Sequence, residues 1–288
     1  MFKHVEGLKK KLGLSKSQKL TARPFQRNTR NTNYILDVDG EARYFLKVEA
    51  EGHDKERKVH EFLSHYPLVP SISPVYIDER LMVFPFFPDL RDARVGDNLD
   101  FILKFHSKSL SLPSELFEKY FGGRQFSNLY LSRFVDRIGR HREMVENFWQ
   151  DSKELEDYYS ENSGKNFEGL PKILVHGDIQ HKNLQTNGEG VIVLIDFEDS
   201  YFDSPAWDLT RPLMDLSPEE FGPFVETYVK NSEIGDKTKL RRVIHRDFLV
   251  RIVTDAIGRQ QRFGERNAQR YLDLYRKYAG KIREILDQ

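Results

Sequence analysis

The first third of the chain alternates hydrophobic and polar positions in a pattern that predicts strands around one helix. Two β-type runs, Thr32 to Asp37 and Ala42 to Val48, flank the polar segment Asp37 to Gly40, which favours a hairpin. The next segment, Asp54 to His65, places its hydrophobic residues on one side at helical spacing. The run Leu81 to Phe84 then predicts the last strand of this part.

Beyond Pro88 the hydrophobic residues recur mostly at helical spacing. The exception is the apolar run Val191 to Ile195, which follows the glycine-containing turn Thr186 to Gly190 and predicts a second hairpin. We therefore predict an α+β fold of two lobes, with an antiparallel sheet and one helix in the small N-terminal lobe. The larger C-terminal lobe should be mainly helical around the second β-hairpin. We expect the lobes at residues 1–84 and 91–288, with a hinge at 85–90.

A long helix is predicted near the C-terminus by a hydrophobic stripe that we expect to pack in the core. The stripe consists of Phe248, Leu249, Ile252, Val253, Ala256 and Ile257. Arg251, Arg259 and Arg262 lie between these positions. We expect them mostly on the solvated face of the helix.

Composition excludes several kinds of protein. The chain has no cysteine, so disulfides, thiolate catalysis and zinc–thiolate sites are ruled out. Lys plus Arg equal Asp plus Glu at 45 each, so no overall charge favours nucleic acid or a membrane surface. The apolar runs are too short to span a bilayer, and the basic N-terminus predicts a short amphipathic surface helix. We expect a cytoplasmic protein without nucleic-acid or membrane partners, whose oligomeric state the sequence does not indicate.

One segment in the second half combines residue types that suit phosphoryl transfer. Asp178 ends a His-Gly-Asp triplet, Asn183 follows it, and Asp196 ends the apolar strand of the second hairpin. Transfer to a hydroxyl needs a carboxylate that accepts or orients the hydroxyl proton, and hard oxygen ligands for magnesium. Asp178 is the candidate for the first role, and Asn183 with Asp196 for the second. Single residues of these types often only cap turns or end strands, but the whole set at this spacing argues against that alternative.

The set resembles the catalytic and metal-binding segments of the aminoglycoside phosphotransferase and choline kinase family, small-molecule relatives of the protein kinases. The family pattern is His-Gly-Asp, four residues, Asn, then Ile-Asp-Phe/Trp, then Pro-x-x-Asp-Leu. The chain matches it with His176, Gly177, Asp178, Asn183, Ile195, Asp196, Phe197, Pro205, Asp208 and Leu209. The resemblance implies a protein-kinase-like fold and Mg²⁺-dependent transfer of the γ-phosphoryl of ATP to a small hydroxyl acceptor. It implies supporting roles for His176, a buried orienting residue, and Asp208, a brace for the catalytic loop.

Lys47 is the candidate phosphate-binding lysine of the N-terminal lobe. It lies near the end of a predicted strand among apolar neighbours, which suits a desolvated ammonium that holds nucleotide phosphates. A strand lysine is often only a solvated edge residue. Glu56, in the helix that follows, resembles the glutamate that pairs with this lysine in kinases. Glu61 is the alternative partner, and the register favours Glu56.

The segment before the first hairpin departs from the protein-kinase pattern. Where protein kinases carry a glycine-rich phosphate loop, Phe25 to Asn31 contains no glycine, although glycine lets the backbone approach phosphate closely. Arg27 or Arg30 could contact phosphate directly. GTP therefore stays open as a donor beside ATP.

The acceptor is predicted to be small, because Pro205 and Asp208 follow Asp196 too closely to leave room for an activation loop or a peptide platform. Carboxylates near the site, such as Glu198 and Asp203, would favour an amine-bearing acceptor, whereas arginines would favour an anionic one. The sequence contains both. Two alternatives stay open: a non-catalytic nucleotide-binding scaffold on the same fold, and a kinase that acts on a macromolecular partner.

Overall fold

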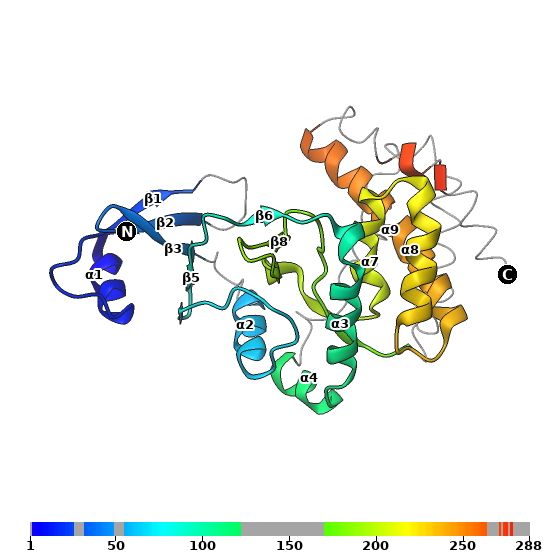
Figure 1. Cartoon of the computed structure of the whole chain (residues 1–288), viewed down its shortest axis with the longest axis horizontal. Helices are drawn as coiled ribbons and strands as arrows, with labels where there is room; N and C mark the ends of the chain where they lie inside the picture. The colour runs from blue at the N-terminus through cyan, green and yellow to red at the C-terminus, as the bar shows by residue number, and fades with distance from the viewer. Residues whose placement is uncertain are drawn as a thin grey trace. The chain divides into compact units, whose positions relative to one another are not determined.

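The computed structural model describes residues 2–25, 32–48, 55–121 and 170–263, together with 271, 273–275 and 277–278. The chain divides into two compact units (Figure 1). The first consists of residues 1–93 and 181–199, and the second of residues 94–180 and 200–288. The hairpin after Asn183 therefore groups with the N-terminal strands, which the sequence pattern did not predict.

The first unit is built on a five-stranded antiparallel sheet in the order β1-β2-β3-β5-β4. Its elements are α1 (Phe2–Lys11), β1 (Leu20–Pro24), β2 (Thr32–Val38), β3 (Glu41–Val48), α2 (Lys55–His65), β4 (Tyr76–Ile77) and β5 (Leu81–Pro85). Asp39 and Gly40 both have positive φ, 54° and 91°, which is the conformation of a tight hairpin turn between β2 and β3. The predicted first hairpin and the helix that follows it are confirmed.

Hydrophobic side chains join helix α1 to this sheet. Leu8 is buried in one cluster with Leu36, Leu46 and Val83, which come from strands β2, β3 and β5. The last residue of this helix also contacts the sheet region, since Lys11 contacts the Tyr76 hydroxyl. The N-terminal helix thus covers part of the sheet, as its amphipathic pattern predicts.

A second, three-stranded antiparallel sheet in the first unit has the order β6-β8-β9. Its strands are β6 (Arg91–Asp92), β8 (Leu184–Thr186) and β9 (Ile192–Leu194), followed by the 3₁₀ helix η4 (Phe197–Asp199). Asn187 closes the turn between β8 and β9, because its side-chain Oδ1 accepts hydrogen bonds from the N–H groups of Glu189 and Val191 at 3.1 and 2.9 Å. Gly190 supplies the positive φ, 78°, that this turn requires. The predicted second hairpin is confirmed.

The second unit is mainly helical. Its elements are η1 (Val95–Asn98), α3 (Leu99–Leu110), α4 (Ser114–Phe121), β7 (Ile173–Val175), β10 (Tyr201–Asp203), α7 (Ala206–Asp215), α8 (Pro218–Asn231) and α9 (Lys237–Phe263), and β7 pairs antiparallel with β10. Helix α8 begins with a capping box between Ser217 and Glu220, with Pro218 in its first turn. Helices α7 and α8 both pack against α9, and the predicted stripe from Phe248 to Ile257 is buried there. The predicted α+β class is confirmed.

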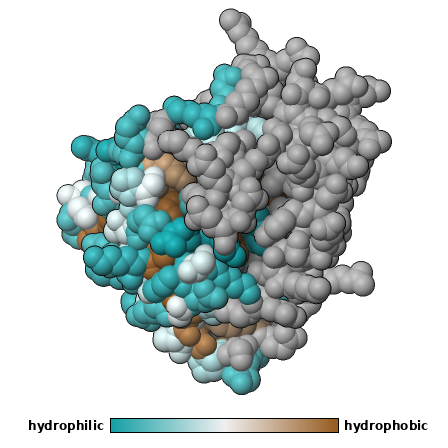
Figure 2. All heavy atoms as spheres, turned by 90° about the vertical axis from the view of Figure 1, so that its right-hand side faces the viewer, coloured by the Kyte–Doolittle hydropathy of each residue, from teal (hydrophilic) through white to brown (hydrophobic). Residues whose placement is uncertain are grey.

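The described part of the surface in Figure 2 is mainly polar, and none of the described helices is both long and apolar. On the face drawn in Figure 2, most described residues at the surface are hydrophilic, and small hydrophobic areas show between them. Within the described ranges, no helix combines the length and the apolar character that crossing a membrane demands.

Candidate active site

Lys47 is at the centre of a group of charges in the first unit. Strand β3 buries it to 7 % exposure. Its Nζ atom forms an ion pair with Glu56 of helix α2 and lies 2.8 Å from Oδ1 of Asp196. Glu198 is farther away, with its Oε2 atom 3.7 Å from the same ammonium. Among the two predicted partners of Lys47, Glu56 makes the pair, whereas Glu61 pairs with Arg57 at 3.1 Å along the helix.

The pair between Lys47 and Glu56 keeps both groups charged although both are buried. Burial alone raises the pKa of Glu56, but the Lys47 ammonium and His60 outweigh it and hold that pKa below its ordinary value. Burial likewise opposes the charged form of Lys47, and the carboxylates of Glu56 and Asp196 nevertheless raise its pKa. The two ions therefore depend on each other, because either one alone would be a buried unpaired charge.

The β8–β9 hairpin brings Asn183 and Asp196 together from its two ends. The N–H of Ile195 donates to the backbone oxygen of Asn183 at 3.0 Å, and Asp196 is the next residue. Asp196 has a φ of 65°, in the left-handed region that a non-glycine residue adopts only at a cost. The chain therefore leaves strand β9 at Asp196 with a strained bend. Asn183 is itself buried to 7 % exposure.

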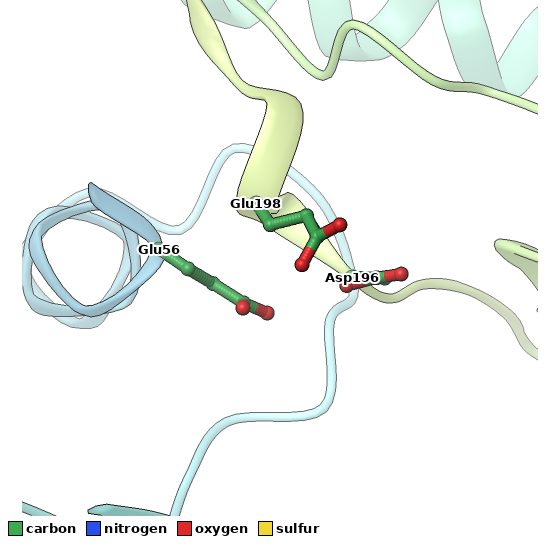
Figure 3. A group of neighbouring side chains, drawn as sticks. All are labelled: Glu56, Asp196 and Glu198. Atoms are coloured by element: carbon green, nitrogen blue, oxygen red, sulfur yellow. The ribbon is translucent and has the colours of Figure 1, made fainter. Parts of the chain in front are cut away.

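Three carboxylates meet beside the lysine. Figure 3 shows that Glu56 from helix α2 and Glu198 from η4 extend toward Asp196, and one oxygen atom of each lies within 4.8 Å of the others. Burial, and after it the charge of Asp196, raises the pKa of Glu198 to about 7. Carboxylate oxygens are the ligands that magnesium prefers, so the donor chemistry of this group fits that ion. In the structure the Lys47 ammonium supplies the compensating positive charge.

Asp178 belongs to the second unit, where two arginines contact it. Its Oδ1 atom accepts hydrogen bonds from Nε of Arg211 at 2.8 Å and from Nη2 of Arg251 at 3.3 Å. Its Oδ2 atom accepts from Nε2 of Gln180 at 2.6 Å. Burial alone raises the pKa of Asp178, but the two guanidinium groups outweigh it and lower that pKa. The carboxylate is thus held ionised and fixed in orientation.

Asp208 supports the backbone on which Asp178 stands. Its two oxygen atoms accept hydrogen bonds from the N–H groups of His176, at 2.9 Å, and Gly177, at 2.6 Å. Nε2 of His106 lies 3.1 Å from the same carboxylate. His176 is fully buried, and its Nδ1 accepts from the N–H of Asp178 at 3.3 Å. The contacts of His176 and Asp208 match the supporting roles that the resemblance implies.

One expectation from the sequence is wrong. Arg251 is not on a solvated face but has an exposed fraction of 1 %. Its Nη1 donates to the backbone oxygen of Gly177 at 3.1 Å, and its other nitrogens reach Asp178 and Asp255. These acceptors make burial of the guanidinium possible, because a buried charge requires ionic and hydrogen-bonding partners. The side chains of Arg259 and Arg262 lie outside the described residues.

Sequence reasoning also missed Arg211 and Asp255. Nη1 of Arg211 lies 2.6 Å from Oδ2 of Asp255, so the two arginines and two aspartates form one group of charges. A signal for part of it was present, because Arg251 and Asp255 stand four residues apart in an otherwise apolar stretch. Arg27 and Arg30, the candidates for direct phosphate contacts, lie outside the described residues.

Comparison with known protein families gives one match in the part of the chain that carries these motifs. A model described as "Phosphotransferase enzyme family" matches residues 120–243. This range includes Asp178, Asn183 and Asp196. The predicted resemblance is confirmed. No curated protein matches the chain.

Solved structures of the same fold span almost the whole chain. Aminoglycoside 2′-phosphotransferase IIIa in complex with GDP superposes with a TM-score of 0.68 at 14 % identity, covering 97 % of each chain. Choline kinase from Cryptosporidium parvum gives 0.66 at 12 % identity, covering 100 % of this chain and 97 % of the other. Macrolide 2′-phosphotransferase type I gives 0.62 at 15 % identity, covering 96 % and 97 %. The predicted protein-kinase-like fold is therefore confirmed.

Proposed function

We propose that the protein is a phosphotransferase that moves the γ-phosphoryl of ATP, or of GTP, to a hydroxyl group of a small molecule. The observation that carries the proposal is the buried Lys47, which forms ion pairs with both Glu56 and Asp196. A buried lysine paired with a helix glutamate is the arrangement that positions nucleotide phosphates in kinases. The match to the phosphotransferase family over residues 120–243 supports the same reading.

Each residue of the proposed site has a role that its surroundings support. Lys47, held by Glu56, would contact the nucleotide phosphates. Asn183 and Asp196 would hold Mg²⁺, which neutralises charge on the phosphates when it is bound. Asp178 would accept a hydrogen bond from the acceptor hydroxyl and orient it. Because Arg211 and Arg251 hold Asp178 ionised, it suits orientation of the hydroxyl better than strong proton abstraction.

Lys47 is occupied by carboxylates in this structure. Nucleotide phosphates would therefore compete with Asp196 for the ammonium, and a cation bound by Asp196 would weaken its hold on Lys47. We expect donor and magnesium to bind cooperatively for this reason. The relatives of known structure act on antibiotics or choline according to their names, and this chain would share their class of reaction.

The proposal is tested by nucleotide consumption of the purified full chain with Mg²⁺. ATP and GTP are each supplied with pools of amino sugars, aminoglycosides, choline-like amines, sugars and hydroxy acids. Acceptor-dependent release of ADP or GDP, with a phosphorylated acceptor seen by mass spectrometry, is the expected result. Tight Mg²⁺–nucleotide binding without transfer to any pool would contradict the proposal and favour a nucleotide-binding scaffold.

A further inference from the structure

Arg211 is held in a fixed position by two carboxylates. Its Nε donates to Asp178 at 2.8 Å, and its Nη1 lies 2.6 Å from Asp255. Both contacts join it to residues of its own unit. The two carboxylates already restrict the conformations of this side chain before any ligand binds. A further hydrogen bond from the guanidinium to a ligand therefore costs little side-chain entropy.

One edge of this guanidinium is unused. The contacts of Arg211 involve Nε and Nη1, the latter also lying 3.9 Å from the sulfur of Met214, and Nη2 has no partner among the described residues. The side chain is 18 % exposed, so it is not closed off. Arg251 differs, because Nε, Nη1 and Nη2 all contact protein oxygens and the residue is 1 % exposed. Of the two arginines, Arg211 is therefore the one whose Nη2 can donate a hydrogen bond to a ligand.

The charges around Asp178 do not favour a cationic acceptor. Asp178 contacts Arg211 at 2.8 Å and Arg251 at 3.3 Å. Asp255 contacts the same two arginines at 2.6 and 3.4 Å. Each carboxylate is therefore compensated twice, and this group offers no unpaired negative charge to an amine. A spare guanidinium edge, by contrast, matches the oxygen atoms of a carboxylate or a phosphate.

We propose, on the basis of the proposed function, that Arg211 binds an acidic group of the acceptor through Nη2. The acceptor is then an anionic alcohol, a hydroxy acid or a phosphorylated alcohol, and not a polycation. Arg211 both orients Asp178 and recognises the substrate. The acid group of the acceptor lies within reach of one guanidinium while its hydroxyl reaches Asp178.

The test measures binding by calorimetry, with the full chain, Mg²⁺ and a non-hydrolysable ATP analogue. Four three-carbon alcohols carry different groups: glycerate a carboxylate, glycerol 3-phosphate a phosphate, glycerol hydroxyls alone, and serinol an ammonium in place of the central hydroxyl. We expect the two anions to bind more tightly than the other two, and the preferred anion tells carboxylate from phosphate. In Arg211→Gln the anions should bind ten- to a hundredfold more weakly, and Arg211→Lys should recover part of the loss. Glycerol binding should weaken much less than anion binding, because glycerol loses only the orientation of Asp178 by Arg211. Arg241→Gln, which removes a surface pair with Glu226, is the matched control and should bind all four as the wild type does.

Tighter binding of serinol than of either anion would overturn the inference. So would anion binding that is absent, or that Arg211→Gln leaves unchanged. The discrimination between anion and neutral alcohol separates recognition from a general loss of structure, because a misfolded variant would lose both. Phosphoryl transfer measured separately tells the two proposals apart. Transfer to an amine-bearing acceptor that is insensitive to Arg211→Gln would leave the proposed function standing and remove only the inference on the acceptor.

Discussion

The Nζ atom of Lys47 lies 2.8 Å from Oδ1 of Asp196, so a strand of the five-stranded sheet is tied to the end of the β8–β9 hairpin. The two residues are 149 positions apart in sequence. In the proposed mechanism one of them contacts the nucleotide phosphates and the other contacts magnesium. The ion pair therefore holds the two parts of the donor site together before nucleotide binds.

Loss of the Glu56 carboxylate should destabilise the protein strongly. In Glu56→Gln the buried Lys47 keeps only partly exposed acidic partners, and removing one member of a buried pair costs about 3–5 kcal/mol. We expect the free energy of unfolding, measured with urea, to fall by that amount. Glu61→Gln on the same helix is the control, because Glu61 is 46 % exposed and should cost less than about 1 kcal/mol. Equal losses in the two variants would contradict the assigned pairing.

Removal of the Asp196 carboxylate should abolish the effect of magnesium on nucleotide binding. We expect Mg²⁺ to tighten ATP binding at least about tenfold in the wild type, and to have no such effect in Asp196→Ala. Fluorescence titration of a nucleotide analogue with and without Mg²⁺ measures both. Asp199→Ala, three residues away, should behave as the wild type. An undiminished magnesium effect in Asp196→Ala would show that the ion is held elsewhere.

Asp208 should be needed for the stability of the backbone around Asp178. Asp208→Asn retains one acceptor oxygen but places an amide N–H group toward a backbone donor, since both carboxylate oxygens accept from N–H groups. An unsatisfied buried donor costs about 1–3 kcal/mol. Thermal and urea unfolding should therefore show a loss of that size. Asp215→Asn, at the exposed end of the same helix, is the control, and an equal effect there would refute the bracing role.

Asp203 should make stability depend on pH. Burial, and after it the Asp247 carboxylate, raises the pKa of Asp203 to about 7 from its ordinary value of 3.8. Between these values the folded protein holds a proton that the unfolded chain releases, so this group lowers the free energy of unfolding as pH rises from about 4 to 7. Asp203→Asn keeps the oxygen that accepts from the N–H of Ser204 and removes the charge.

Relative to the wild type, Asp203→Asn should therefore be more stable at pH 8 than at pH 4, by a difference on the order of a few kcal/mol. Urea unfolding of both proteins at the two pH values measures this difference, in which the other titrating groups cancel. A difference that does not change with pH would mean that Asp203 ionises normally.

Features that depend on neighbouring residues were predictable from the sequence. Both hairpins follow from local turn chemistry, at Asp39-Gly40 and at Asn187 to Gly190. The burial of Lys47 follows from its place in an apolar strand. The helix register favoured Glu56 over Glu61 as its partner, and the ion pair is made by Glu56.

Features that depend on distant contacts were not predictable in the same way. Arg251 stands on a helix whose apolar stripe was identified correctly, but its burial depends on Gly177 and Asp178, which lie more than 70 positions earlier. Arg211 likewise reaches Asp178 across 33 positions. Such contacts between distant residues cannot be read from a single sequence. Without them both residues are expected to be surface arginines, because most arginines are exposed.

The most direct test of the central claim is acceptor-dependent phosphoryl transfer by Asp178→Asn, measured beside its Mg²⁺–nucleotide affinity. The amide cannot accept the hydroxyl proton and presents a weaker acceptor, so we predict a turnover lower by a factor of about 10²–10⁴, with nucleotide affinity within a factor of about two of the wild type. Full turnover in Asp178→Asn would contradict the assignment of Asp178 as the residue that acts on the acceptor hydroxyl.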